Sequence, residues 1–241
     1  MNTRKTISVI IPVHNEEKFI GRCLDSLDSQ VDKPDEIIII DNHCTDKTIE
    51  IAHTHNVKVI FEITRGITPT RNAGFDFATS DVICRCDADC VLPSDWIKKI
   101  RTRFEKEDID ALGGNASFFD FPFKMGLYIK LYLWSSRIIF GHNILLGPNM
   151  SLTKEIWNRV KPHICMNDKK VHEDLDLSIH LNEVGAEIAY DTNHTVYISA
   201  RRIKYKPWSF FIEYPYRMLT TLHYHKIIGK INRILYKRRK K

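Results

Sequence analysis

Residues 81–89 read Asp-Val-Ile-Cys-Arg-Cys-Asp-Ala-Asp, a short, mostly apolar run that ends in two carboxylates one residue apart. The run fits a buried strand, and side chains two positions apart in an extended segment lie on the same face. Asp87 and Asp89 therefore present acidic oxygens side by side, as a site for Mg²⁺ or Mn²⁺ with room for substrate phosphates requires. An isolated Asp-x-Asp is more often a loop with two solvated acids, so the interpretation depends on the rest of the chain.

Strand-like and helix-like segments alternate around this run. The expected strands are residues 7–11, 37–40, 57–61 and 82–86, and the expected helices are residues 16–29, 45–54, 69–78 and 94–105. Such alternation indicates βαβ units, which build an α/β fold with a mostly parallel, Rossmann-like sheet flanked by helices. Sheets of this kind bind ligands beyond the carboxyl ends of their strands. Polar clusters at 12–16, 41–46 and 87–89 follow three of the strands, so we predict that they meet in one crevice.

The second half of the chain is less regular. Residues 111–117 are typical of a strand that is interrupted at Gly113 and Gly114. Residues 118–140 are rich in aromatic side chains and carry the cations Lys130 and Arg137. This segment fits a helix at a membrane interface and fits a core helix equally well, so both interpretations stay open here.

Length and composition set the class of protein. With 241 residues and 43% hydrophobic content, the chain suits one large α/β domain, alone or with a small appendage. Its six cysteines show no metal-knuckle spacing, and no secretory signal is visible before the first apolar run. No stretch approaches 18 uninterrupted apolar residues. We therefore expect reduced thiols and a cytoplasmic location.

The charge is divided unevenly along the chain. Residues 201–241 hold thirteen Lys and Arg and one acid, a formal charge of +12, whereas the preceding 200 residues carry −6. A basic, helical C-terminal extension on an acidic body indicates an anionic surface as partner, a membrane or a nucleic acid. Phosphate backbones would be repelled by a carboxylate-rich crevice, so we expect the inner face of the plasma membrane and no nucleic acid.

Five motifs occur in the order and approximate spacing of a known family. They are Ser8-Val-Ile-Ile-Pro-Val-His-Asn-Glu-Glu17, Arg65-Gly66 with Arg71-Asn-Ala-Gly74, Asp87-Ala-Asp89, Gly147-Pro-Asn-Met-Ser151 and His172-Glu-Asp174. Over about residues 6–190 the chain resembles family 2 glycosyltransferases. The resemblance implies a GT-A fold, a nucleotide-diphospho-sugar donor, a divalent metal (Mn²⁺ or Mg²⁺) and inversion at the anomeric carbon.

The resemblance also implies roles in binding the donor. Asp89 is the direct metal ligand, and Asp87 serves the ribose or water-mediated metal contacts. A metal held there would offset the negative charge that develops on the departing nucleoside diphosphate. Asp41, at the end of the second strand, is implied to bind the nucleotide.

Three residues of the first strand–helix turn, Pro12, His14 and Glu16, are expected to wrap the nucleoside. Glu16 also fits a first-turn acid that the helix dipole favours. Arg71 offers a planar fork for a phosphate or for Asp87, and its alternative is a surface helix cation.

The acceptor hydroxyl needs a general base, and the adjacent pair Glu173 and Asp174 supplies the candidates. Adjacent helix positions diverge by about 100°, so the two carboxylates cannot do the same job. The resemblance makes Asp174 the base and Glu173 a supporting or acceptor-binding group. Two acids that stabilise a helix N-terminus are the alternative.

The chain also departs from the family pattern. After Asp41 the family often has a second acid and then Gly-Ser, whereas this chain has Asn-His-Cys, which leaves the nucleobase open. The Gln-x-x-Arg-Trp motif of processive synthases is absent, because the only glutamine is Gln30. Transfer of a single sugar is therefore favoured. The C-terminal residues Arg201, Arg202, His223 and His225 could reach the diphosphate, but we expect surface or membrane-facing roles for each.

These observations favour an enzyme with a defined organisation. We expect a GT-A domain at 1–200, with a donor-binding half at 6–110 and an acceptor-binding half at 111–200, followed by the extension at 201–241. The expected function is hexosyl transfer to a glycan or lipid-linked acceptor in cell-surface glycan or glycolipid synthesis. A dinucleotide-dependent oxidoreductase is excluded because no Gly-x-Gly occurs. An inactive nucleotide-sugar-binding or scaffold protein of the same fold is the alternative.

Overall fold

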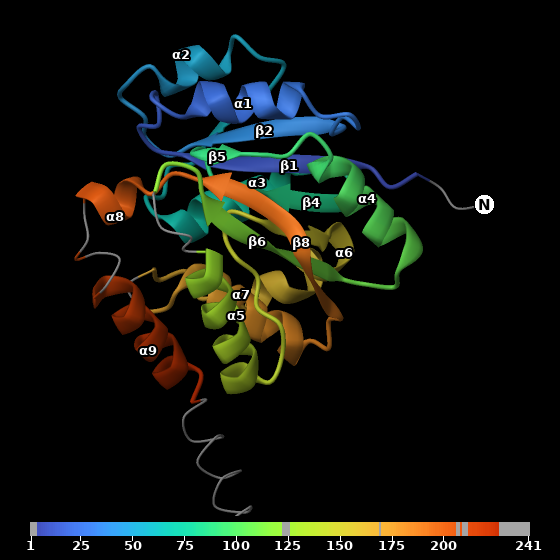
Figure 1. Ribbon diagram of the computed structural model, residues 1–241, viewed down its shortest axis with the longest axis vertical. Helices are drawn as coiled ribbons and strands as arrows, with labels where there is room; N and C mark the ends of the chain where they lie inside the picture. Colours follow the sequence, from blue (N-terminus) through green and yellow to red (C-terminus); the bar gives the residue numbers. More distant parts are fainter. Residues whose placement is uncertain (1–3, 122–125, 169, 206–207, 209–211, 227–241) are drawn as a thin grey trace, which may run out of the picture.

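The computed structural model describes residues 4–121, 126–168, 170–205, 208 and 212–226 (Figure 1). The strands are β1 (Ile7–Val13), β2 (Glu36–Asp41), β3 (Lys58–Phe61), β4 (Val82–Arg85), β5 (Cys90–Val91), β6 (Ala111–Phe118), β7 (Met150–Thr153) and β8 (Ile188–Ile198). The helices are α1 (Ile20–Asp28), α2 (Thr48–Ala52), α3 (Ile67–Phe77), α4 (Trp96–Lys106), α5 (Gly126–Phe140), α6 (Lys154–Val160), η1 (Lys161–His163), α7 (Glu173–Glu183), α8 (Arg201–Tyr205) and α9 (Tyr214–Tyr224).

Within the described residues the strands form one eight-stranded sheet in the order β3-β2-β1-β4-β7-β6-β8-β5. The first four strands are parallel, as the sequence predicts. The second half is mixed, because β7 runs antiparallel to both β4 and β6, and β5 runs antiparallel to β8. The chain leaves β1 toward β2 and β3 and then returns to the other side of β1 with β4. The switch point therefore lies between the carboxyl ends of β1 and β4.

Helices cover both faces of this sheet, which explains why its central strands are mostly apolar. Val9 and Ile11 of β1 pack in one core cluster with buried side chains of α1 and α4. Ile10, on the opposite face, packs in a second cluster with side chains of α3, α6 and α7. Gly74 allows α3 to approach β1, because a Cβ there would clash with Ile10 and lie 2.9 Å from Ile40 Cδ1.

The glycine pair in β6 does not end the strand. Pairing with β8 shifts register between Gly114 and Asn115, and the strand continues to Phe118. A Cβ at Gly114 would clash with the side chain of Asn149 and the carbonyl oxygen of His194. The expected interruption is therefore a local irregularity that lets other chain segments approach the sheet closely.

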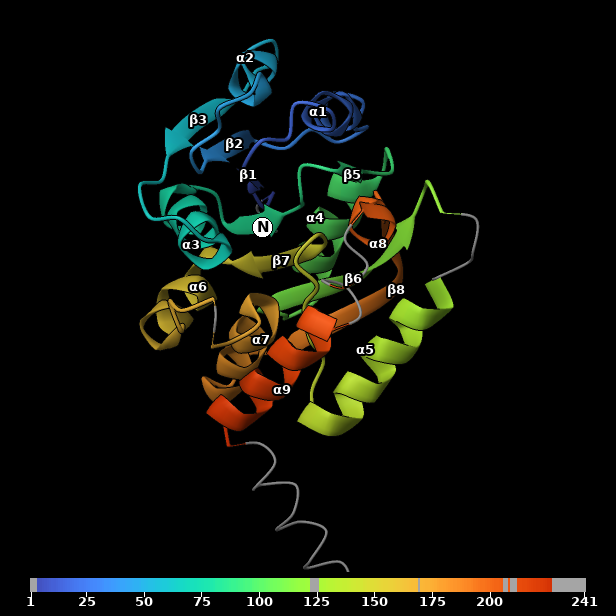
Figure 2. The same ribbon diagram turned by 90° about the vertical axis from the view of Figure 1, so that its left-hand side faces the viewer.

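Helix α5, which contains the aromatic segment, and helix α9 pack beside α7, away from α1 and α2 (Figure 2). Leu133 of α5 is buried, whereas Trp134 and Ile138 are 62% and 63% exposed. One face of α5 is therefore a core face and the other is exposed, and the membrane-interface interpretation stays a prediction. No helix within the described ranges is long and apolar enough to cross a membrane. Residues 227–241, with seven of the thirteen basic residues of the C-terminal segment, lie outside the described part.

Candidate active site

The loops that follow β1 and β2 are bound to each other. His14 Nδ1 lies 2.7 Å from the carbonyl oxygen of Asn42, and the backbone N–H of Glu16 donates to Thr48 Oγ1 at 2.7 Å. Asp41 ends β2, as predicted, and its Oδ1 accepts the N–H of Cys44 at 2.8 Å. Two of the predicted polar clusters therefore lie side by side at the carboxyl edge of the sheet.

Asn42 replaces the second acid of the family pattern, and the structure gives it a positioning role. Its Nδ2 donates to the carbonyl oxygens of Glu62 and Thr64 at 3.1 and 2.9 Å, and its Oδ1 accepts the N–H of Gly66 at 3.1 Å. Gly66 has φ 135°, a backbone conformation that residues other than glycine rarely adopt. Asn42 thus fixes the connection that leads from β3 into α3 and to Arg71.

Two guanidiniums and a carboxylate form a buried charge cluster beneath this edge. The side chains of Arg71, Arg85 and Glu173 are 0%, 3% and 8% exposed. Glu173 Oε2 pairs with Arg71 Nη1 and Glu173 Oε1 pairs with Arg85 Nη1. Arg85 Nη2 also lies 2.9 Å from Asp87 Oδ1. Arg71 therefore faces Glu173, and Arg85 is the arginine that pairs with Asp87.

The pKa values of the two arginines in this cluster shift in opposite directions. Burial alone would lower the pKa of Arg85, but the charges of Glu173 and Asp87 outweigh burial and raise it. For Arg71 burial dominates, and its pKa is lowered despite Glu173. Arg85 thus remains a cation that connects the strand-end carboxylate to the start of α7.

Asp89 is paired across the crevice with a residue from the C-terminal segment. Arg201 Nε lies 3.0 Å from Asp89 Oδ2, and its two terminal nitrogens each lie 2.6 Å from an oxygen of Glu16. The same guanidinium lies over the ring of Phe19, 4.6 Å from its centroid. We expected a surface or membrane-facing role for Arg201. It lies in the crevice instead, because α8 follows β8 directly and β8 pairs with β5 beside the Asp89 loop (Figure 1).

The two adjacent acids at the start of α7 diverge. Glu173 points to the arginines, whereas Asp174 Oδ2 accepts the N–H of Gly147 at 3.2 Å. Asp174 Oδ1 lies 2.5 Å from His172 Nδ1 and forms an ion pair with it when the ring is protonated. Burial would raise the pKa of Asp174, but the charge of His172 outweighs it and lowers that pKa. The pKa of His172 is raised by Asp174 against the effect of its own burial, so the carboxylate stays ionised.

The glycine-proline-asparagine motif supports this arrangement. A Cβ at Gly147 would lie 3.2 Å from Arg85 Nη2 and 3.4 Å from Glu173 Oε1, so a side chain there would crowd the Arg85 guanidinium. Asn149 is buried, and its Nδ2 donates to the carbonyl oxygens of Asn115 and His194 at 2.8 Å each. The motif thus ties the start of β7 to β6 and β8.

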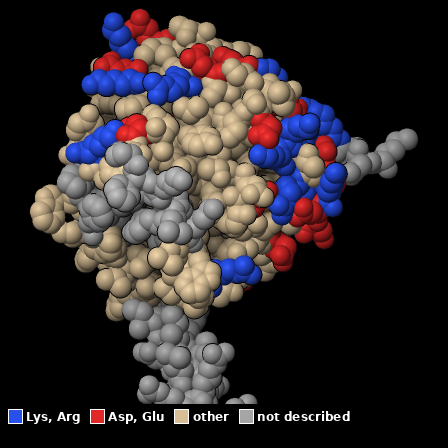
Figure 3. Space-filling model, in the orientation of Figure 1, with Lys and Arg blue, Asp and Glu red and all other residues tan. Residues whose placement is uncertain are grey.

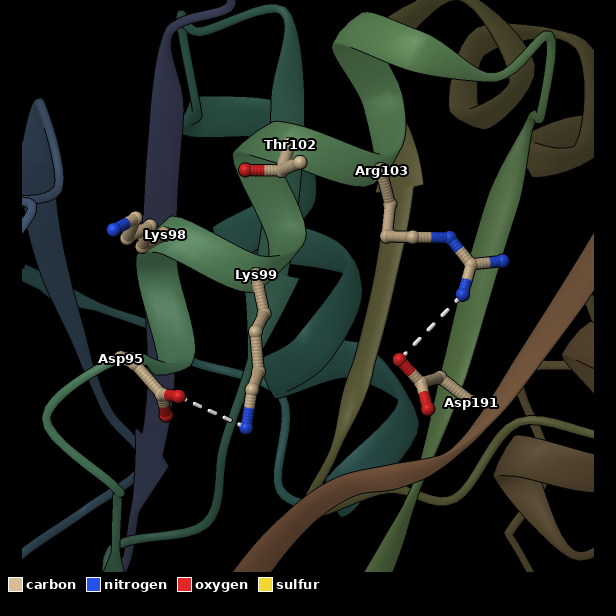
Figure 4. A pocket seen from close by; sticks show the side chains of 6 residues that line it. All are labelled: Asp95, Lys98, Lys99, Thr102, Arg103 and Asp191. Carbon is tan, nitrogen blue, oxygen red and sulfur yellow. Dashed lines mark hydrogen bonds and ion pairs between the residues drawn. The ribbon is translucent and has the colours of Figure 1, made fainter.

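The contacts connect the separated motifs into one site. Asp89 is linked to Glu16 through Arg201, and Asp87 is linked to Glu173 through Arg85. Sequence reasoning missed Arg85, although a cation inside a buried strand is a signal for a paired site. It also gave His172 no role of its own. A surface pocket on α4 and the start of β8 contains none of the predicted site residues (Figure 4). Its lining residues are Asp95, Lys98, Lys99, Thr102, Arg103 and Asp191.

An α/β sheet covered by helices on both faces, with carboxylates at its switch point, defines a protein of GT-A architecture. Solved structures have this fold. TarS of S. aureus in complex with UDP-GlcNAc is 22% identical, with a TM-score of 0.65 over 81% of this chain and 59% of that one. The mannosyltransferase PcManGT from Pyrobaculum calidifontis, in complex with GDP-Man and Mn²⁺, is 20% identical, with a TM-score of 0.67 over 86% and 60%.

The sequence model of glycosyl transferase family 2 matches residues 8–166, and the chain belongs to this family. An uncharacterized glycosyltransferase of Haemophilus influenzae is 28% identical over 220 residues, which is 86% of each chain. Glycosyltransferase AglE of Haloferax volcanii is 30% identical over 125 residues, 48% of this chain and 41% of AglE. The chain thus matches less than half the length of AglE.

Proposed function

We propose that this protein transfers one sugar from a nucleotide-diphospho-sugar to an acceptor hydroxyl with inversion at the anomeric carbon. The observation that carries the proposal is the convergence of Asp87, Asp89 and Asp174 on one edge of the sheet. Asp87 is joined to the start of α7 through Arg85 and Glu173. Family membership supports glycosyl transfer. The complexes of TarS with UDP-GlcNAc and of PcManGT with GDP-Man give examples of possible donors.

The donor half, residues 6–110, would hold the nucleoside along the loops after β1 and β2. Pro12, His14, Glu16 and Asp41 belong to these loops, which the His14–Asn42 contact holds together. The guanidinium of Arg201 would meet the diphosphate, because it already places a positive charge between Glu16 and Asp89. Arg71 would act indirectly, because it holds Glu173 in place.

The residues at the strand end fit a divalent cation. Asp87 and Asp89 are hard oxygen donors, and the position beside Asp89 already attracts a positive group, the guanidinium of Arg201. Asp89 would be the direct ligand, with Asp87 nearby. Bound there, Mn²⁺ or Mg²⁺ would offset the negative charge on the leaving nucleoside diphosphate.

Asp174 would accept the proton of the acceptor hydroxyl as that oxygen attacks the anomeric carbon. The Gly147 N–H and His172 hold the carboxylate in place and keep it ionised, while Glu173 is occupied by two arginines. General bases of this kind contribute about 10²- to 10⁴-fold in rate. Residues 111–200 would form the acceptor half.

Nucleoside diphosphates with and without Mn²⁺, followed by thermal shift, test the donor site. The wild-type chain should be stabilised by one of UDP, GDP or dTDP, more strongly with Mn²⁺ present. Asp89→Ala should lose the Mn²⁺-dependent part, whereas Asp95→Ala, an exposed carboxylate on the α4 surface, should keep it. Equal stabilisation of both variants would refute the assignment of Asp89. Nucleotide binding without transfer to any acceptor would favour the scaffold alternative.

We also propose that the acceptor is lipid-linked and that the protein binds the inner face of the plasma membrane, as part of cell-surface glycan synthesis. Leu131, Trp134 and Ile138 follow one another at helical spacing on α5, and all three are exposed. Tyr216 and Leu219 of α9 are exposed as well. Charged side chains gather over the upper part of the molecule and over α4 (Figure 3). An exposed apolar face, in a chain with a basic C-terminal segment, suits an anionic bilayer.

Sedimentation with anionic vesicles tests this second proposal. Replacing Trp134 and Ile138 by Ser should weaken binding at least tenfold, since each buried apolar side chain contributes about 1.5–3 kcal/mol. Ile63→Ser is the matched control. Ile63 is 77% exposed, but it follows β3, the edge strand on the side of the sheet away from α5 (Figure 2). Equal binding by both variants would refute the apolar face as the membrane contact.

A further inference from the structure

Two imidazoles and a carboxylate meet where the end of α9 reaches α7. His180 follows Asp176 by one turn of α7, and His225 comes directly after the last residue of α9. One ligand atom from each side chain lies within 4.8 Å of the others. Asp176 is 1% exposed, and the side chains of His180 and His225 are 13% and 5% exposed. None of the three has a role in the proposed transfer reaction.

The spacing of these atoms fits a bound metal ion. Asp176 Oδ1 lies 2.9 Å from His225 Nε2 and 3.6 Å from His180 Nε2. Two ligands of a tetrahedral Zn²⁺, each about 2.0–2.1 Å from the ion, are roughly 3.3 Å apart. The other oxygen, Asp176 Oδ2, accepts the N–H of Cys165 at 2.9 Å, which fixes Oδ1 toward the imidazoles.

The contacts of the two His180 ring nitrogens also fit a bound metal ion. Its Nδ1 lies 2.8 Å from Glu183 Oε2, and because a carboxylate only accepts, Nδ1 carries the proton. The other ring nitrogen, Nε2, faces Asp176 Oδ1 at 3.6 Å, a distance too long for a hydrogen bond. A cation between these two atoms could bind both of them. Metal-bound histidines almost always donate their other N–H to a carboxylate or carbonyl in this manner.

We infer that Asp176, His180 and His225 bind a transition-metal ion of the Zn²⁺ class, which fastens α9 to α7. Imidazole nitrogens select such ions, whereas Mg²⁺ and Mn²⁺ prefer oxygen ligands like those at Asp89. The site is independent of the proposed transfer reaction. It also holds the helix that carries Thr221, whose Oγ1 accepts the N–H of His172 at 2.7 Å.

Zn²⁺ titration of the tag-free full-length chain against a chromophoric chelator, in excess Mg²⁺ to fill oxygen-only sites, tests the inference. We expect one Zn²⁺ per chain and, with Co²⁺ instead, the visible absorption of a tetrahedral ion. His180→Gln and His225→Gln should each lose the site. His223→Gln, an exposed histidine on the same helix, should keep it, and so should Asp89→Asn.

A milder variant covers the case in which the ligand variants fail to fold. Glu183→Ala removes the outer partner of His180, and Glu183 is 44% exposed. We expect Zn²⁺ affinity to fall roughly 10- to 100-fold. An unchanged affinity in Glu183→Ala, no stoichiometric Zn²⁺ in the wild type, or full binding by folded His180→Gln or His225→Gln would overturn the site.

Discussion

Glu173 contacts two buried guanidiniums at once, so removing its charge tests the energetic core of the site. Arg71 is wholly buried and Arg85 is 3% exposed. Glu173→Gln keeps the shape of the side chain and one acceptor oxygen, but it removes the negative charge. A buried cation that loses its carboxylate is strongly destabilised, because water cannot replace the lost partner.

The size of the effect follows from which pairs survive. Arg85 keeps Asp87 at 2.9 Å, so only Arg71 loses its carboxylate partner in the salt bridges of the described residues. Breaking one buried pair costs about 3–5 kcal/mol. For a domain of this size each kcal/mol lowers the Tm by about 2–4 °C, so we expect a fall of roughly 6–20 °C.

Urea unfolding and calorimetry without nucleotide measure this change. Glu155→Gln, at an exposed position in the first turn of α6, is the matched control and should stay within about 0.5 kcal/mol of wild type. Replacing Arg71 by Met together with Glu173→Gln should recover part of the loss, since no unpaired charge remains. A loss below about 1 kcal/mol for Glu173→Gln would refute the reasoning, because it would mean that water already screens the cluster.

Three further outcomes are expected. Asp174→Asn should abolish transfer while nucleotide affinity changes little, as a base acts mainly in the transition state; retained transfer would point to Glu173. His172→Gln removes the charge that keeps the pKa of Asp174 low while burial still raises it, so the acid limb of the kcat/KM–pH profile should move to higher pH. An unmoved limb would contradict the pairing. Gly74→Ala should cost about 1–3 kcal/mol in urea unfolding, because its methyl group would clash with Ile10 in a filled core; a neutral result would show that α3 can shift.

The first half of the fold was predictable because its signals are local. Each parallel strand is a continuous apolar run followed by polar residues, and the structure has a strand within a residue or two of each predicted run. The main boundary error is the start of α1 at Ile20 rather than near residue 16. The N–H groups of Phe19 and Ile20 both donate to the carbonyl oxygen of Glu16, so residues 16–19 form a turn that leads into the helix.

The second half was not predictable in the same way. Strand β7 begins within the motif at residues 147–151, which the sequence analysis used only as a sign of the family. It pairs antiparallel with β4 on one side and β6 on the other. Strand β8 contains Asp191, Asn193 and His194 and lacks a clean alternation. Its pairing with β6 shifts register at Gly114, which lowers the local signal further. Pairing between residues far apart in the chain determines these strands, and the local pattern of a single sequence does not reveal that pairing.

The carboxylates of the site could be found from sequence because each follows a strand or starts a helix, whereas their cationic partners could not. Arg201 lies 112 residues from Asp89 and 185 from Glu16, and composition placed it in a uniformly basic tail. The structure divides that tail. Arg201 is used inside the crevice, and Lys204 pairs with Asp120. The +12 of the C-terminal segment therefore overstates the charge available to a membrane, so the proposed membrane contact would need the apolar face of α5 as well as the basic residues of the C-terminal segment.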